Sequence, residues 1–350
     1  MKISDLSESQ LLALFLPIID EHNQRVAQRQ QGESPVLTLG PGDDCAVLNL
    51  LQGKTVMTID TQTENQDFRR VWASGYESGG YDVGWKASVQ NLGDIAAMGA
   101  QPQTLLVSLS LPGDVESDWV KDFARGICDS TLAQGADFCT IAGGDLGRSS
   151  EISVTVTAVG SSSGEPVRRD SATPGDVLAV AGSLGAAACG LDLLETPQQQ
   201  LEELDDYQRF FTGQTRPAGA LCYGLVAAQS AHAMMDISDG LLRDAGRIAR
   251  ASGIGINIDS QKLAAFFEPL RPAAACVSAW GGKQESPEQI LLRWVATGGE
   301  DHAMLAAFAP DRVPTGFTVV GRCGSEFAPE APVTVDGRVF DRSGWDHFSG

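Results

Sequence analysis

Four stretches decide the fold: LLVSLSL at residues 105–111, WVKDFARGICDSTLAQ at 119–134, FCTIA at 138–142 and ISVTVTAV at 152–159. The first, third and fourth are short apolar runs with several β-branched residues, which is typical of strands. The second carries apolar residues at helical spacing over sixteen positions, which indicates an amphipathic helix. Strands that alternate with a helix of this length are typical of α/β domains. We therefore predict an α/β domain around residues 105–159.

The same alternation extends toward the N-terminus. Short strands are predicted at Val36 to Leu39, Ala46 to Leu50 and Thr55 to Ile59, and a long helix at Val83 to Met98. The apolar run Leu11 to Ile19 is predicted to lie in a first helix. Ser7 and Gln10 precede it with the spacing of a capping box.

The chain has 350 residues, more than one hydrophobic core usually supports, and this length favours two domains. A stretch rich in turn formers and poor in apolar residues, 161–176, is the best candidate for a linker. A second α/β unit begins with the apolar strand Val177 to Ala181. We therefore predict an N-terminal domain at 1–160 and a C-terminal domain at 177–350, both of the α/β (α+β) class. The glutamine-rich segment Glu195 to Pro217 is predicted to be an exposed helix or excursion.

Composition limits the possible partners and compartments. Acidic residues number 45 and basic residues 25, and the net charge of −20 argues against nucleic acid or anionic membrane as the main partner. No apolar stretch approaches the length of a membrane span. The seven cysteines include no C-x-x-C pair and are predicted to be reduced thiols, which favours a cytoplasmic protein.

Carboxylates follow many of the predicted strands or begin the helices, and Asp94 lies three residues after Asn91 on one face of a helix. A single aspartate beside glycine is usually a turn residue or a helix cap. Several carboxylates gathered at strand ends repel one another unless bound cations offset their charge. Oxygen ligands without His or Cys suit Mg²⁺, which also binds substrate phosphates. This set of carboxylates therefore predicts phosphoryl transfer. Besides Asp94 it comprises Asp43, Asp44, Asp60, Asp145, Asp236, Asp239, Glu300 and Asp301.

Other familiar motifs are absent from the sequence. Gly53-Lys-Thr looks like the end of a P-loop, but Leu48 stands where that motif needs its first glycine. Neither G-x-G-x-x-G after a strand nor G-x-S-x-G occurs, and the four histidines show no metal-ligand spacing. Nucleophilic triads and zinc hydrolysis therefore have little support.

The carboxylate turns are also where the sequence resembles a known family. The matching motifs, in order along the chain, are Gly40-Pro-Gly-Asp-Asp-Cys-Ala-Val47, Asp60-Thr61, Lys86-Ala with Asn91-Leu-Gly-Asp-Ile-Ala-Ala-Met-Gly-Ala100, Gly143-Gly-Asp145, Asp236-Ile-Ser-Asp-Gly240 and Gly298-Gly-Glu-Asp301. In content and order they are similar to the thiamine-monophosphate kinases, from about Gly40 to the Gly344-Trp-Asp-His-Phe348 tail.

The resemblance implies a fold of two α/β domains, shared with aminoimidazole-ribonucleotide synthetase and selenophosphate synthetase. It implies a cytoplasmic homodimer in which the N-terminal domain binds ATP and several Mg²⁺ ions and forms the dimer. The C-terminal domain is expected to complete the nucleotide and thiamine phosphate site. The implied reaction is direct transfer of the ATP γ-phosphate to thiamine monophosphate, giving thiamine diphosphate and ADP.

The resemblance also assigns roles by position. Magnesium positions are matched by Asp44, Thr58, Asp60, Asp94, Asp145, Asp236 and Asp239, of which Asp44, Asp94 and Asp145 are expected to be central to catalysis. Nucleotide-phosphate positions are matched by Gly144, Asp145, Arg169 and Ser238. Positions that line thiamine phosphate are matched by Asp67, Glu300 and Trp345. Many relatives carry histidine in place of Asp67, threonine in place of Leu146 and tyrosine in place of His302.

The chemistry agrees with these positions, and three alternatives stay open. The attacking phosphate oxygen is already ionised at neutral pH, so no general base is required. A selenophosphate synthetase would need a reactive Cys near its N-terminus, and residues 1–39 contain none. An aminoimidazole-ribonucleotide synthetase type of enzyme is another alternative within the superfamily. A non-catalytic nucleotide- or metal-binding relative is the third, and an ATP-turnover assay separates it from the enzymes.

Overall fold

The computed structural model describes residues 1–30, 36–41, 45–50, 53–202, 204–280, 284–340 and 344. The chain forms two compact units. Unit 1 comprises Met1–Trp72, Glu77–Ile95 and Ala100–Glu165, and unit 2 comprises Ala73–Tyr76, Ala96–Gly99 and Pro166–Gly350. The main change of unit, after Glu165, falls inside the segment 161–176 that the sequence marks as a linker.

Unit 1 is built on a mixed sheet covered by helices. Its elements are α1 (Glu8–Arg29), β1 (Leu37–Leu39), β2 (Val47–Leu48), β3 (Lys54–Thr63), α2 (Gly80–Ala97), β4 (Gln101–Leu111), α3 (Ser117–Ala133), β5 (Thr140–Arg148) and β6 (Ser153–Ser162). Among the described residues, four strands form one sheet in the order β3-β6-β4-β5, in which only β4 and β5 run parallel. A separate small hairpin pairs β1 with β2.

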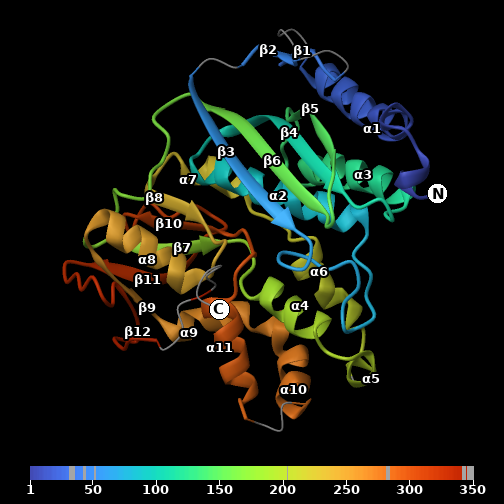
Figure 1. Ribbon diagram of the computed structural model, residues 1–350. Helices are drawn as coiled ribbons and strands as arrows, with labels where there is room; N and C mark the ends of the chain where they lie inside the picture. The colour runs from blue at the N-terminus through green and yellow to red at the C-terminus, as the bar shows by residue number, and fades with distance from the viewer. Residues whose placement is uncertain are drawn as a thin grey trace. The chain divides into compact units, whose positions relative to one another are not determined.

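Helices α2 and α3 cover one face of this sheet (Figure 1). The burial of β3 agrees with this arrangement. From Val56 onward its side chains alternate between an inner face, which is buried or half-buried, and an outer face, which is mostly exposed. Gln62, on the inner face, donates to Gln90 of α2 at 2.9 Å. On the outer face Met57 is 65% exposed and Ile59 is 63% exposed, and Leu106 of β4 is 37% exposed. The described part of unit 1 therefore leaves apolar side chains uncovered on one face of its sheet.

The predicted capping box at the start of α1 is confirmed. Gln10 N–H donates to the Ser7 hydroxyl at 3.3 Å, and Ser7 N–H donates to the Gln10 side-chain oxygen at 2.8 Å. The helix continues through Pro17 to Arg29 and contacts α3 and β5. His22 fixes part of that contact, because its Nε2 lies 2.9 Å from the carbonyl oxygen of Cys139.

Unit 2 is built on a second mixed sheet. Its elements are β7 (Val177–Ala181), α4 (Ala186–Leu194), α5 (Gln198–Leu201), α6 (Gln208–Thr215), α7 (Leu221–Ala227), β8 (Ala231–Asp236), α8 (Leu241–Ser252), β9 (Gly255–Ile258), α9 (Ser260–Leu263), α10 (Arg271–Trp280), α11 (Pro287–Thr297), β10 (Met304–Phe308), β11 (Thr318–Gly324) and β12 (Val333–Val335). The described strands form one sheet in the order β12-β9-β11-β7-β10-β8. Strands β7 and β10 are buried at every position.

Burial on both faces explains the continuous apolar sequence of these central strands. On one face, Val177, Ala179, Met234 and Phe308 pack with Ala227 of α7. Helix α8 contacts β8, β9, β10 and β12 of the same sheet. None of the helices in the described ranges is long and apolar enough to cross a membrane.

Three details of the sequence prediction were wrong. Gly143, Gly144 and Asp145 do not follow a strand that ends at Ala142, because β5 runs on to Arg148. Asp60 likewise lies inside β3, which continues to Thr63. The segment Glu195 to Pro217 is not a simple exposed excursion, because α6 buries Phe210, Phe211, Gln214 and Thr215. Strand continuation and this burial depend on pairing and packing with residues distant in sequence.

Candidate active site

Three predicted metal-binding residues of unit 1 lie on the inner side of its sheet. Thr58 and Asp60 are two positions apart on β3 and share the face that α2 covers. The Thr58 hydroxyl donates to the Asp94 carboxylate of α2 at 2.5 Å. The strand and the helix therefore bring three oxygen-bearing side chains to one side of the sheet.

Asp145 lies on the other side. Strand pairing aligns Asp145 with Ser108, Ser108 with Thr155, and Thr155 with Thr61. Residues paired directly across strands present their side chains on the same face. Asp145 therefore shares a face with Thr61 and not with its neighbour Asp60. Strands β3 and β5 are also opposite edges of the described sheet, about 14 Å apart across two intervening strands.

Gly144 and Asp145 border a cavity of about 660 Å³ in unit 1. Most of its lining side chains are apolar, among them Leu12 and Phe15 of α1 and Phe123 of α3. Gly144 lies so close to β4 that a Cβ atom would stand 1.7 Å from the carbonyl oxygen of Val107. The Gly143-Gly144-Asp145 segment therefore combines a close backbone contact with an exposed carboxylate at the rim of a ligand-sized cavity.

Asp67 closes the turn after β3. Its carboxylate accepts a hydrogen bond from Thr63 N–H at 2.7 Å, and its carbonyl oxygen accepts one from Lys86 Nζ at 2.7 Å. Lys86 is only 2% exposed, so this hydrogen bond lies in the protein interior. Asp67 therefore has a structural contact in addition to the predicted role in substrate binding.

In unit 2, two turns hold most of the predicted site residues together. Glu300 N–H donates to the carbonyl oxygen of Ser238 at 2.8 Å, and His302 N–H donates to that of Ile237 at 3.0 Å. The ring of His302 lies 3.1 Å from the carboxylate of Asp236. The Asp236–Gly240 turn and the Gly298–Asp301 turn therefore form one paired structure. It brings together Asp236, Ser238, Asp239 and Glu300.

Two residues that the sequence analysis missed support this structure. The carboxylate of Asp244, in the first turn of α8, accepts hydrogen bonds from Ser238 N–H and Asp239 N–H, both at 3.0 Å. Arg247 donates to Asp244 at 2.5 Å and also to the carboxylate of Asp239. Burial raises the pKa of Asp244 to about 7, and the Arg247 guanidinium opposes that rise. An acidic residue in the first helical turn, three positions before an arginine, was the available sequence signal.

Asp301 anchors the second turn to the start of α4. Its carboxylate accepts from Gly185 N–H at 2.6 Å and from Ala187 N–H at 3.0 Å. Burial raises the pKa of Asp301 to about 7, although these backbone donors favour its charged form.

The remaining predicted site residues either form no hydrogen bond with the two paired turns in the described part of the chain or lie outside that part. Arg169 is exposed, and its carbonyl oxygen accepts from the Ser252 hydroxyl at 3.1 Å. Asp44 and Trp345 lie outside the described residues. Gly344 is described, and a Cβ atom there would stand 2.2 Å from the carbonyl oxygen of Asp239. The residue before Trp345 is therefore in close contact with the Asp236–Gly240 turn.

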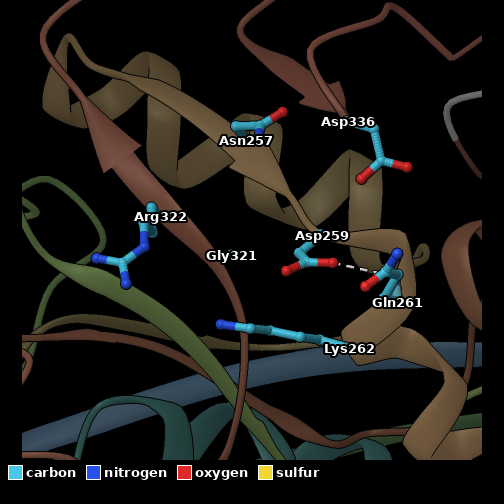
Figure 2. A pocket seen from close by; sticks show the side chains of 7 residues that line it. All are labelled: Asn257, Asp259, Gln261, Lys262, Gly321, Arg322 and Asp336. Carbon is cyan, nitrogen blue, oxygen red and sulfur yellow. Dashed lines mark hydrogen bonds between the residues drawn. The ribbon is translucent and has the colours of Figure 1, made fainter.

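A polar hollow of about 390 Å³ in unit 2 contains none of the predicted site residues (Figure 2). Lys262 and Arg322 contribute cations to its lining, and Asp259 and Asp336 contribute carboxylates. Asp259 accepts from Gln261 N–H at 3.0 Å, and Asp336 accepts from Ser260 N–H at 3.1 Å. Both carboxylates therefore hold the start of α9.

Comparisons with known proteins agree with the fold and with the family resemblance. Residues 42–162 match the family described as AIR synthase related protein, N-terminal domain, and residues 173–314 match its C-terminal domain. A thiamine-monophosphate kinase of Mycobacterium tuberculosis is 34% identical over 323 residues, which cover 91% of this chain and 89% of the relative.

Solved structures give the same result. A structure described as AaThiL complexed with AMPPCP and TMP has a TM-score of 0.69 and 29% identity, and the match covers 99% of each chain. The thiamine-monophosphate kinase of Stenotrophomonas maltophilia K279a has a TM-score of 0.72 and 29% identity, with 92% of this chain and 96% of that chain covered. The chain therefore belongs to the thiamine-monophosphate kinase family of AIR synthase related proteins.

Proposed function

We propose that this protein transfers the γ-phosphate of ATP directly to thiamine monophosphate, giving thiamine diphosphate and ADP. The relatives named above support this reaction, and the AaThiL structure was obtained with AMPPCP, an ATP analogue, and TMP. We further propose that both units supply oxygens for Mg²⁺ and residues for the nucleotide phosphates and the acceptor.

One observation carries the proposal most directly, the 2.8 Å hydrogen bond from Glu300 N–H to the carbonyl oxygen of Ser238. It joins a residue expected at the nucleotide phosphates to a residue expected at the acceptor. A kinase must hold donor and acceptor in line within a short distance of each other. Pairing of the two turns provides a rigid support for that arrangement.

We propose that Mg²⁺ is the metal. Thr58, Asp60 and Asp94 provide only oxygen atoms on one side of the unit 1 sheet, and Asp236 and Asp239 do so in unit 2. Within the described ranges, no three His, Cys, Asp or Glu side chains form a ready-made metal cluster. Mg²⁺ is usually held by one or two carboxylates together with substrate phosphates, so small oxygen sets of this kind fit it. These side chains would hold Mg²⁺, which would supply positive charge to offset the charge of the substrate phosphates.

The chain's own residues then have simple tasks. The attacking group is an ionised phosphate oxygen, so no side chain has to remove a proton. The exposed guanidinium of Arg169 suits bidentate contact with a phosphate. Glu300 contributes negative charge that suits the cationic thiazolium ring of the acceptor.

We also propose a cytoplasmic homodimer. The uncovered sheet face of unit 1 exposes the apolar side chains of Met57, Ile59 and Leu106 in a chain of net charge −20. Exposed apolar surface of this kind commonly marks a protein interface. A second copy of the chain is the expected partner, because most oligomers are symmetric homo-oligomers.

Product analysis tests the reaction. Thiamine monophosphate, free thiamine and an aminoimidazole precursor are each incubated with ATP and Mg²⁺, and products are identified by phosphorus NMR. We expect thiamine diphosphate and ADP from thiamine monophosphate alone. Free thiamine lacks the phosphate, and its hydroxyl would need a base. Phosphorylation of thiamine, or turnover only with the purine precursor, would overturn the proposal.

A further inference from the structure

Gln214 donates a hydrogen bond from its side-chain amide to the carboxylate of Glu300. Gln214 is 3% exposed and belongs to α6, a helix 86 residues away in sequence from its partner. A carboxylate only accepts hydrogen bonds, so the NH₂ group of the amide must face it. We propose that Gln214 is a positioning residue that fixes the orientation of the Glu300 carboxylate for a cationic acceptor. This inference rests on the proposed function.

Close packing of two helices places Gln214. A Cβ atom on Gly213 of α6 would stand 2.3 Å from the carbonyl oxygen of Ala186 in α4. A Cβ atom on Gly190 of α4 would stand 2.7 Å from the carbonyl oxygen of Phe210. Only glycine at both positions allows the helices this close. The depth of α6, and with it the position of the Gln214 amide, is therefore set by backbone contact.

The backbone of Glu300 is constrained as well. Its φ angle of 65° lies in the left-handed region, which is unfavourable for a residue with a long side chain. The turn keeps this conformation because Glu300 N–H is bonded to Ser238 and because Asp301 is bonded to the start of α4. Such strain is typical of functional sites. Gln214 adds a contact at the end of the side chain, where the ligand would meet it.

The chemical type of the donor matters. Asp239 in the neighbouring turn contacts the guanidinium groups of Arg247 and Arg243, which offset its charge. Gln214 is neutral, so it orients the Glu300 carboxylate without adding positive charge beside it. A carboxylate that a neutral donor holds in place suits recognition of the thiazolium or aminopyrimidine of the acceptor.

A hollow lies beside this turn. A cavity of about 520 Å³ is lined by Phe210 and Gly213 of α6, by Ala186 of α4 and by Asp301. Its volume is within the range of small-ligand sites. The helix that carries Gln214 therefore borders a ligand-sized space next to the residue that follows Glu300.

The test compares Gln214→Leu with Gln208→Leu. Leucine has nearly the same size but no donor, and Gln208 is an exposed glutamine on the same helix. We expect Gln214→Leu to raise the KM for thiamine monophosphate about tenfold, the usual cost of losing one hydrogen bond to a charged group. The KM for ATP should stay within about twofold of wild type, since a misfolded site would change both. Gln208→Leu should change neither.

Direct binding and a charge exchange complete the test. Titration calorimetry with thiamine monophosphate alone should show the same roughly tenfold weakening for Gln214→Leu. The double variant Gln214→Glu with Glu300→Gln keeps one amide and one carboxylate in contact but exchanges their positions. It should recover the thermal stability that Gln214→Glu loses through carboxylate repulsion, and it should still bind the acceptor poorly.

The outcomes separate the two proposals. Wild-type protein that uses thiamine monophosphate, together with an unchanged acceptor KM in Gln214→Leu, overturns the role of Gln214 and leaves the proposed function standing. Equal increases in the KM for thiamine monophosphate and the KM for ATP in Gln214→Leu would also overturn the role of Gln214. Restored acceptor binding in the double variant would do the same. Wild-type protein that does not use thiamine monophosphate overturns the proposed function, and the inference with it.

Discussion

Arg247 and Asp244 form an ion pair beside the Asp236–Gly240 turn, with 2.5 Å between the guanidinium nitrogen and the carboxylate oxygen. Asp244 is fully buried and also accepts from the backbone N–H groups of Ser238 and Asp239. The pair therefore connects a helix to the turn that carries predicted nucleotide- and metal-binding residues.

Replacement of Arg247 by Met should lower the free energy of unfolding by about 2 kcal/mol, because it leaves a buried carboxylate without its cation. Arg250→Met, at an exposed position on the same helix, should change stability by less than about 0.5 kcal/mol. Urea denaturation measures both variants. Equal stability of the two variants would contradict a supporting role for Arg247.

Asp94→Asn should reduce kcat at least about a hundredfold, because it removes a negative oxygen from the proposed metal site. The fold should persist, since the asparagine oxygen still accepts from the Thr58 hydroxyl. Rates over a range of Mg²⁺ concentrations and circular dichroism spectra measure these effects. Asp118→Asn, on the exposed side of α3, is the matched control. Wild-type rates in Asp94→Asn at saturating Mg²⁺ would remove Asp94 from the metal set.

Ile59→Asp should convert the proposed dimer to a monomer, because it places a charge in the apolar face of the unit 1 sheet. Val71→Asp is the matched control, since Val71 is also 63% exposed but lies outside that sheet. Sedimentation velocity at micromolar concentration distinguishes the two. A wild-type protein that is monomeric and still turns over substrate would contradict the proposed homodimer.

His22→Gln should reduce the acid sensitivity of the fold. Burial lowers the pKa of His22 below its usual 6.5, and nearby Arg25 and Arg29 act in the same direction. Below that pH the unfolded chain binds a proton that the folded chain resists, so the free energy of unfolding falls as pH falls. Glutamine can still donate to the Cys139 carbonyl oxygen but does not titrate.

The measurement is urea denaturation between about pH 5 and pH 8 in wild type and His22→Gln. A constant offset would reflect altered packing, whereas a shallower pH dependence isolates the titration. Parallel profiles for wild type and His22→Gln would place the acid sensitivity at other residues.

The sequence by itself determined the local features and the family of the protein. The capping box of Ser7 and Gln10 follows from residues three positions apart, and β7 was predicted with its observed ends because both faces of that strand are buried. The ordered motifs pointed to the family because each keeps its residues within a few positions. Acidic side chains without cysteine or histidine ligands indicated oxygen coordination.

Only the tertiary structure decided which of the predicted site residues share a face of a sheet and which other side chains form hydrogen bonds with them. Asp60 and Asp145 lie on opposite faces because the register of β3, β6, β4 and β5 is fixed by pairing between distant segments. Gln214 contacts Glu300 because two glycines let α4 and α6 approach closely. Contacts of this kind depend on backbone positions set by the whole core, and local sequence patterns carry no information about them.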